Sequence, residues 1–170
     1  MNRVLLVAAV ALLSAGAHAQ PANPLDVIPE KIPFATPYGP PISLARAQVL
    51  VQTAMAEASR RGWPMNIAVA DAAGHPLAFA RMDGAVLAAV AISQHKARVA
   101  VTYRRPTKVY EDALQNPALA YLLTLDDVIA SRGGIPLIEN GLVIGGIGCS
   151  GGTSSQDQAV CAAAAATINK

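Results

Sequence analysis

Apolar side chains recur at three- and four-residue steps over residues 44–61, the spacing that places them on one face of an amphipathic helix. Serine and glycine stand at the two ends of this segment: Ser43 is a suitable N-cap and Gly62 a suitable stop. The sequence therefore predicts a first helix from Leu44 to Arg61, with one apolar stripe formed by Leu44, Ala47, Val51, Ala54, Met55 and Ala58.

Two short segments with alternating side chains follow this helix. They run from Met65 to Asp71 and from Pro76 to Arg81, and only a turn that includes Ala72-Ala73-Gly74 separates them. Parallel strands need a crossover of about a dozen residues, so a connection this short predicts an antiparallel pair.

The strongest turn signal in the chain is Asn140-Gly141, which stands between the apolar runs 135–138 and 142–147. Both residue types tolerate the positive φ of a type I′ turn, so these runs are expected to form a β-hairpin. The second run opens into a glycine-rich loop over residues 148–153. A last helix, capped by Ser154 or Ser155 and ending near Asn169, is expected to follow.

The middle of the chain predicts a long helix, Ala85 to Tyr103, that is apolar on almost every side before Ser93. Such a helix must be covered on both sides, by the sheet and by a second subunit, which indicates a homo-oligomer. A short helix capped by Thr107 and ending at Gln115 comes next. Residues 118–125 are ambiguous and are taken as helical, and residues 126–130 are expected to form a short edge strand.

This element order groups the antiparallel strands and places helices between the groups. It predicts an α+β fold in which an antiparallel five-stranded sheet is flanked by helices.

Three regions divide the chain. Residues 1–19 carry Arg3, an apolar core and an Ala17-His18-Ala19 cleavage site, as a secretory signal peptide does. Residues 20–42 hold seven prolines and are expected to form an extended arm. Residues 43–170 form the domain. We therefore expect export to the periplasm or beyond, with no membrane span after cleavage.

Charge excludes one class of partner. The whole chain has 13 basic and 11 acidic residues, and removal of Arg3 with the signal peptide leaves 12 and 11. A nearly neutral chain without a basic run and interleaved aromatic residues does not predict binding to nucleic acid.

Two cysteines, Cys149 and Cys161, remain in the domain. Export permits a disulfide, and a helix that folds back over the preceding strand can bring the two close enough. Two buried free thiols account for the same sequence, and both alternatives stay open.

The glycine-rich loop suggests two kinds of chemistry. Gly148-Cys149-Ser150-Gly151-Gly152 matches Gly-x-Ser-x-Gly literally, but no histidine follows Ser150 to act as a base, which argues against a nucleophile. Exposed amides at a helix N-terminus can instead hold an anion. Gly151, Gly152 and Thr153 are therefore candidates for holding a small carboxylate.

The long helix carries a second candidate site. His95 can serve as an axial heme ligand, with Lys96 and Arg98 as cations for the propionates and Tyr103 as another possible ligand. A single histidine on a solvated or interface face is the plain alternative.

Four motifs in order resemble the GlcG/HbpS family of heme-binding proteins, which is related to the C-terminal domain of PduO-type proteins. They are residues 67–75, residues 81–85, Lys96-Ala97, and the Gly-Gly-Ile-Pro-Leu block that runs on to Ser150-Gly151-Gly152. The resemblance implies a profilin-like fold, oligomers that can reach octamers, and binding of heme or a related tetrapyrrole beside subunit contacts.

The resulting expectation is an exported, oligomeric heme-binding protein for sensing or scavenging, without catalysis. One alternative is an enzyme or enzyme accessory acting on a small carboxylated metabolite, held by the glycine-rich loop, with Asp71, His75 or His95 transferring a proton. A structural assembly module is the other.

Overall fold

A single four-stranded sheet organises the protein. The computed structural model describes residues 23–169, so the predicted signal peptide lies outside the described residues. The strands are β1 (Asn66–Asp71), β2 (Pro76–Arg81), β3 (Gly134–Glu139) and β4 (Leu142–Ser150). They lie in the order β2-β1-β4-β3, and every neighbouring pair is antiparallel. The α+β class with an antiparallel sheet is confirmed.

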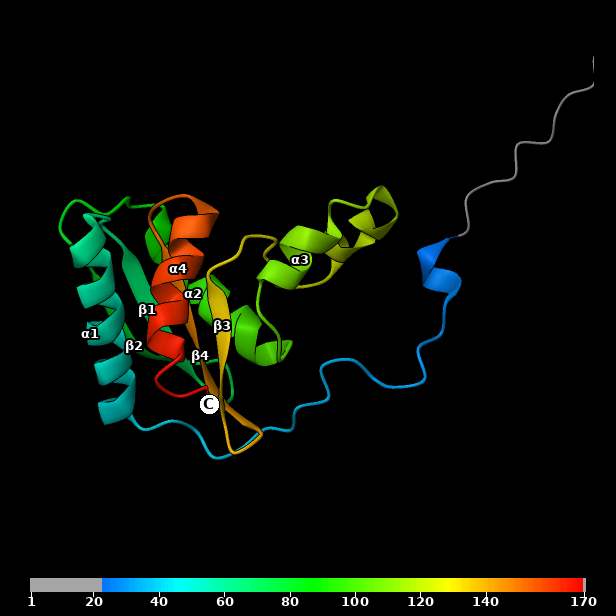
Figure 1. Ribbon diagram of the computed structural model, residues 1–170, viewed down its shortest axis with the longest axis horizontal. Helices are drawn as coiled ribbons and strands as arrows, with labels where there is room; N and C mark the ends of the chain where they lie inside the picture. The colour runs from blue at the N-terminus through cyan, green and yellow to red at the C-terminus, as the bar shows by residue number, and fades with distance from the viewer. Residues whose placement is uncertain (1–22, 170) are drawn as a thin grey trace, which may run out of the picture.

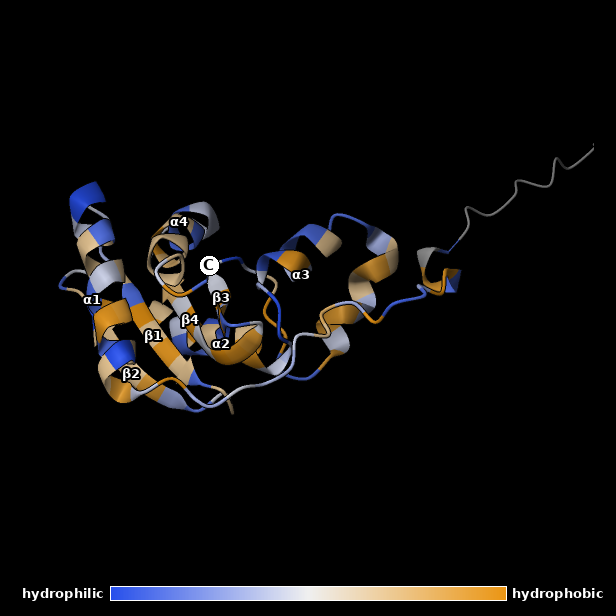
Figure 2. Ribbon diagram, turned by 60° about the horizontal axis from the view of Figure 1, so that its bottom comes forward, coloured by the Kyte–Doolittle hydropathy of each residue, from blue (hydrophilic) through white to orange (hydrophobic). Residues whose placement is uncertain are grey.

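Helices cover both faces of this sheet (Figure 1). Helices α1 (Leu44–Arg61) and α4 (Ser154–Ala165) pack on one face, and α2 (Ala89–Thr102) packs on the other. Alternation along β1 divides the core between the faces: Ile67 and Val69 join the α1/α4 side, whereas Ala68 and Ala70 face α2. Figure 2 shows the apolar residues of the strands enclosed between these layers.

Glycines in β4 let α2 lie unusually close to the sheet. A Cβ atom at Gly146 would come within 2.6 Å of the Ala97 carbonyl oxygen, and one at Gly148 would collide with the backbone of Ser93 and Ala97. Small residues on both surfaces therefore set the distance between helix and sheet.

Three predicted elements have the expected form. Helix α1 has the predicted bounds, the Ser43 hydroxyl accepts from the Arg46 amide at 3.4 Å, and Gly62 ends the helix at φ 69°. Strands β1 and β2 pair as predicted. The β3–β4 hairpin turns at Asn140 and Gly141, with φ values of 51° and 75°.

The prediction of a fifth strand at residues 126–130 is wrong: the described part of the chain has no strand there. Residues 126–130 form a turn without ladder partners. Asp127 adopts φ 62° there, which is incompatible with an extended strand. With four described strands, the five-stranded profilin-like detail is not confirmed.

Other element boundaries differ from expectation. The long helix begins at Ala89 rather than Ala85, and residues 117–124 form a 3-10 helix, η2 (Pro117–Thr124). Helix α3 covers only Lys108–Ala113. The Thr107 hydroxyl does not cap it, because that oxygen accepts from the Gly134 amide at 3.0 Å.

The proline-rich arm is fastened to the domain near its end. Main-chain hydrogen bonds join Gly39 and Ile42 to β4, at Val143 and Ile144. The arm contains a short 3-10 helix, η1 (Pro24–Asp26), and otherwise extends away from the sheet (Figure 1). Among the described helices, none is long and apolar enough to cross a membrane.

A disulfide joins the last strand to the last helix. Cys149 in β4 and Cys161 in α4 are bonded with an S–S distance of 2.11 Å, and both are fully buried. The structure thus selects the disulfide from the two alternatives that the sequence left open.

Candidate functional site

His95 lies on the outer side of α2, beside a shallow surface hollow. The hollow has a volume of about 410 Å³, within the size range of small-molecule sites. Its lining residues are the apolar Val90, Ala91 and Ile92 and the polar Gln94, His95 and Arg98. All six belong to α2. The hollow therefore has only one wall.

Asp127 forms hydrogen bonds with two polar side chains of this hollow, His95 and Arg98. The His95 Nε2 atom lies 2.8 Å from the Asp127 carbonyl oxygen and 3.0 Å from its Oδ1. Both of these atoms are acceptors, so Nε2 carries the hydrogen in this arrangement. Arg98 donates through Nε to Asp127 Oδ2 at 2.6 Å. The Arg98 guanidinium holds the pKa of the Asp127 carboxyl below its usual range.

We call Asp126 and Asp127 the clasp. Tyr103 also contacts it, because its hydroxyl donates to the Asp126 carbonyl oxygen at 2.6 Å. The Tyr103 ring meets the Tyr110 ring edge-on, with 5.6 Å between centroids. Burial raises the pKa of Tyr110 to about 12. The clasp therefore connects His95, Arg98 and Tyr103, three of the predicted site residues.

Lys96, the fourth predicted site residue on or near α2, does not contact the clasp or the hollow beside His95. Its ammonium is buried and donates to Asp157 Oδ2 at 2.8 Å and to the Cys149 carbonyl oxygen at 3.3 Å. Lys96 thus ties α2 to α4 across the end of β4, and its charge does not reach the hollow beside His95.

Main-chain amides of the glycine-rich loop already donate to side chains of the same chain. The Gly152 amide donates to Asp157 Oδ1 at 3.0 Å, and the Thr153 amide donates to Gln156 Oε1 at 2.8 Å. The Thr153 hydroxyl accepts from the Gln156 amide at 3.3 Å, which completes a capping box. Thr153, not Ser154 or Ser155, therefore caps α4.

Gly151 allows close packing, since a Cβ atom there would lie 2.5 Å from the Pro64 carbonyl oxygen.

The predicted site residues fall into two separate groups. His95, Arg98 and Tyr103 meet at the clasp, whereas Lys96 and the loop residues Gly152 and Thr153 are connected through Asp157 and its neighbour Gln156.

Sequence reasoning misses the roles of Asp127 and Asp157. Asp157 stands four residues after Thr153, where a first-turn carboxylate is ordinary. The sequence pattern places Asp127 in a strand, and its partners His95 and Arg98 lie about thirty residues earlier in the chain.

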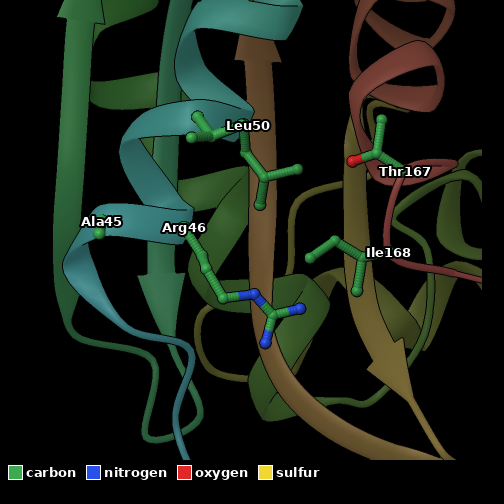
Figure 3. A pocket seen from close by; sticks show the side chains of 6 residues that line it. Ala45, Arg46, Leu50, Thr167 and Ile168 are labelled. Atoms are coloured by element: carbon green, nitrogen blue, oxygen red, sulfur yellow. The ribbon is translucent and has the colours of Figure 1, made fainter.

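A second hollow of about 380 Å³ lies between α1 and the residues after α4 (Figure 3). Arg46 lines it together with Leu50, Thr167 and Ile168, and its guanidinium pairs with Glu139 at 2.6 Å. None of the predicted site residues lines this hollow. Within residues 23–169, no group of three or more His, Cys, Asp or Glu side chains is arranged to hold a metal ion.

Comparison with known proteins gives consistent results. Residues 42–166 match the family described as haem-degrading protein HbpS-like. Protein GlcG of Escherichia coli (strain K12) is 40% identical over 109 residues, which are 64% of this chain and 81% of GlcG.

Two solved structures are similar in fold. The crystal structure of the PduOC:heme complex has a TM-score of 0.69 and 28% identity, and the match covers 76% of this chain and 96% of that one. The crystal structure of HbpS has a TM-score of 0.69 and 26% identity, with coverages of 78% and 93%. Over the whole domain, from the end of the arm into α4, the chain belongs to the GlcG/HbpS family.

Proposed function

We propose that this chain binds heme at the hollow on α2, with His95 as the axial ligand. The observation that carries the proposal is a partly exposed imidazole that lines a hollow together with apolar side chains, with a guanidinium one helical turn away at Arg98. Heme needs these three elements: an iron ligand, an apolar surface for the macrocycle, and a cation for its carboxylates. Heme binding in the PduOC complex supports the proposal.

The clasp must open before His95 can ligate iron through Nε2. A histidine nitrogen that donates to two oxygens has no lone pair to offer, and Arg98 is already paired with the same carboxylate. The observed arrangement is therefore a closed form of the site. Release of Asp127 frees the ligand and the cation together, and the clasp lowers the affinity for heme.

The missing wall supports a second part of the proposal, that the protein is a homo-oligomer. The hollow is built from α2 alone, and the nearby Val86 and Leu87 are exposed. A second copy of the chain would cover these apolar residues and enclose the heme. We extend the proposal to an exported, profilin-like protein in the periplasm or outside the cell, which binds heme for sensing or scavenging.

Heme degradation is the second candidate, because the matching family is described by that activity. It uses the same site, so the two candidates differ in what happens after binding. A stable Soret band in the presence of a reductant and oxygen supports binding alone, and bleaching of the band supports degradation.

The small-carboxylate alternative has less support from the geometry. The amides of Gly152 and Thr153 already donate to Asp157 and Gln156. Asp71, one of its proton-transfer candidates, accepts from the amides of Ala73 and His75 and so holds the β1–β2 turn.

A hemin titration of the purified protein tests the proposal. We expect a shifted Soret band that saturates near one hemin per site, and a loss of affinity of at least roughly tenfold in His95→Ala, since one ligand bond is removed. His75→Ala is the matched control, because His75 is exposed in the β1–β2 turn. Equal titrations of the wild type and His95→Ala would reject this site.

A further inference from the structure

Strand β2 has an open outer edge. In the antiparallel β1–β2 ladder, the Met82 amide donates to the Met65 carbonyl oxygen at 3.0 Å. Bonded and non-bonded pairs alternate along such a ladder. Ala78 and Ala80 therefore turn their main-chain groups toward β1, whereas Phe79 and Arg81 turn theirs outward. No strand in residues 23–169 pairs with that side.

The opposite edge of the sheet is protected. Beside β3, the Asn169 side chain accepts from the Ile138 amide at 2.7 Å and donates to the Pro136 carbonyl oxygen at 2.9 Å. These two bonds occupy the positions of a neighbouring strand. An unprotected edge strand is a template for pairing with another chain, so the contrast singles out β2.

A groove of about 230 Å³ runs beside this open edge. Helix α1 forms one wall, β2 forms the other, and Phe79 remains 42% exposed. The residues that line it are Leu44, Gln48, Val51 and Gln52 from α1 and Leu77, Ala78, Phe79 and Ala80 from β2. A groove between an edge strand and a helix is suited to an extended segment that adds a strand and inserts alternate side chains.

The arm supplies a segment with the matching chemistry. Ile28 and Ile32 are 89% and 80% exposed, and Val27 is 74% exposed. Proline lacks an amide hydrogen, but between Val27 and Pro33 both prolines stand at odd positions. When this stretch is extended, the amides at 28, 30 and 32 all point to one edge, and that edge has no proline. Ile28 and Ile32 then share one face.

The arm of the same copy is held at the other end of the molecule. The Arg105 guanidinium lies 3.9 Å from the centre of the Phe34 ring, and Arg104 donates to the Thr36 carbonyl oxygen at 3.2 Å. The Tyr38 hydroxyl donates to the Thr102 carbonyl oxygen at 3.0 Å. The arm therefore leaves past the C-terminus of α2, on the side of α3 and away from β2 (Figure 1).

We propose that residues 27–32 of one copy add a parallel strand to the outer edge of β2 in a second copy, and that Ile28 and Ile32 enter the groove beside α1. In a parallel pair the arm residues that bond to Phe79 and Arg81 lie opposite Ala78 and Ala80, whose side chains are on the α1 face of the sheet. This contact is head-to-tail, so successive copies form a closed ring or a filament. It lies apart from the hollow at His95 and does not depend on heme.

Two proline substitutions test the pairing in the full chain. Glu30→Pro removes an amide from the pairing edge, and Lys31→Pro removes one from the other edge of the same exposed stretch. By sedimentation across a concentration series, we expect Glu30→Pro to dissociate at a roughly tenfold higher concentration than the wild type, as the loss of one main-chain hydrogen bond predicts. Lys31→Pro should behave as the wild type. A monomeric wild type, or equal behaviour of the two variants, overturns the proposal.

A photo-cross-linking amino acid at position 79 identifies the occupant of the edge. Benzoylphenylalanine replaces Phe79 in an equal mixture of ¹⁴N- and ¹⁵N-labelled protein, and the cross-linked peptides are mapped by mass spectrometry. Mixed-label cross-links to the arm, residues 23–36, support the proposal. Cross-links within one copy only, to another part of the chain, or to a different protein overturn it, and so does the absence of cross-links.

Discussion

Lys96 and Asp157 form a buried ion pair with 2.8 Å between Nζ and Oδ2, and their side chains are only 1% and 4% exposed. The pair joins α2 to α4, and the second oxygen of Asp157 accepts from the Gly152 amide. One carboxylate thus links the central helix, the glycine-rich loop and the last helix, which explains why Lys96 is unavailable to a ligand at the hollow.

Removal of one partner of this pair should leave an uncompensated buried charge. We expect Lys96→Met to lower the free energy of unfolding by about 3–5 kcal/mol, the usual effect for a broken buried pair. Urea denaturation measures it. The double variant Lys96→Met, Asp157→Leu should lose less than Lys96→Met alone, because no charge remains unpaired. A double variant that is less stable than the single one would contradict this account.

The Cys149–Cys161 disulfide closes a loop with a sequence separation of 12 residues. A cross-link of this length constrains the unfolded chain, so we expect the double Cys→Ala variant to lose roughly 3 kcal/mol. Thermal unfolding with and without a reductant is the measurement. The reductant should lower the melting temperature of the wild type and leave the variant unchanged. An unchanged wild type would argue against the bond.

Stability should fall in acid partly through Glu111. Arg132 donates to it from Nε at 2.8 Å and from the main-chain amide at 2.7 Å, and the side-chain bond lowers the pKa of the Glu111 carboxyl. A depressed folded-state pKa gives stability that is complete above the unfolded pKa, about 4.3, and is lost as pH falls through the folded value.

Urea denaturation from about pH 6 to pH 3, a range that spans the unfolded value, checks this dependence. The wild type should lose more stability over the range than Glu111→Gln, which has no carboxyl to protonate. Parallel pH profiles for the two proteins would show that the Glu111–Arg132 pair has no such role.

The clasp predicts a gain of function. Asp127→Ala removes the carboxylate that contacts both His95 Nε2 and the Arg98 guanidinium, and leaves His95 only its bond to the main-chain oxygen of residue 127. Hydrogen bonds to charged groups contribute about 1.5–3 kcal/mol, so hemin affinity should rise roughly tenfold or more. Asp126→Ala is the matched control, because Tyr103 uses only the main-chain oxygen of Asp126. Equal hemin affinities in the two variants would exclude a closed site.

Local signals predict the parts of the fold that depend on neighbouring residues. The bounds of α1 follow from Ser43 and Gly62, and the hairpin turn follows from Asn140-Gly141. The four sequence motifs also predict the family, and the family match over residues 42–166 confirms it.

The errors concern residues whose state depends on distant partners. Asp127 leaves the strand conformation to meet His95 and Arg98, about thirty positions earlier. Lys96 resembles a surface cation in a helical pattern, but its partner Asp157 lies 61 residues later. The spacing of apolar residues along the chain does not indicate such pairs. Sequence reasoning therefore groups Lys96 with His95, whereas the structure separates them.

Replacement of the His95 imidazole by free imidazole shows whether this side chain ligates heme iron. We predict that His95→Gly loses the wild-type Soret spectrum with hemin, and that added imidazole, which can enter the space left by the side chain, restores it. His75→Gly should keep the wild-type spectrum without imidazole. A His95→Gly protein that binds hemin with the wild-type spectrum and affinity would contradict the claim.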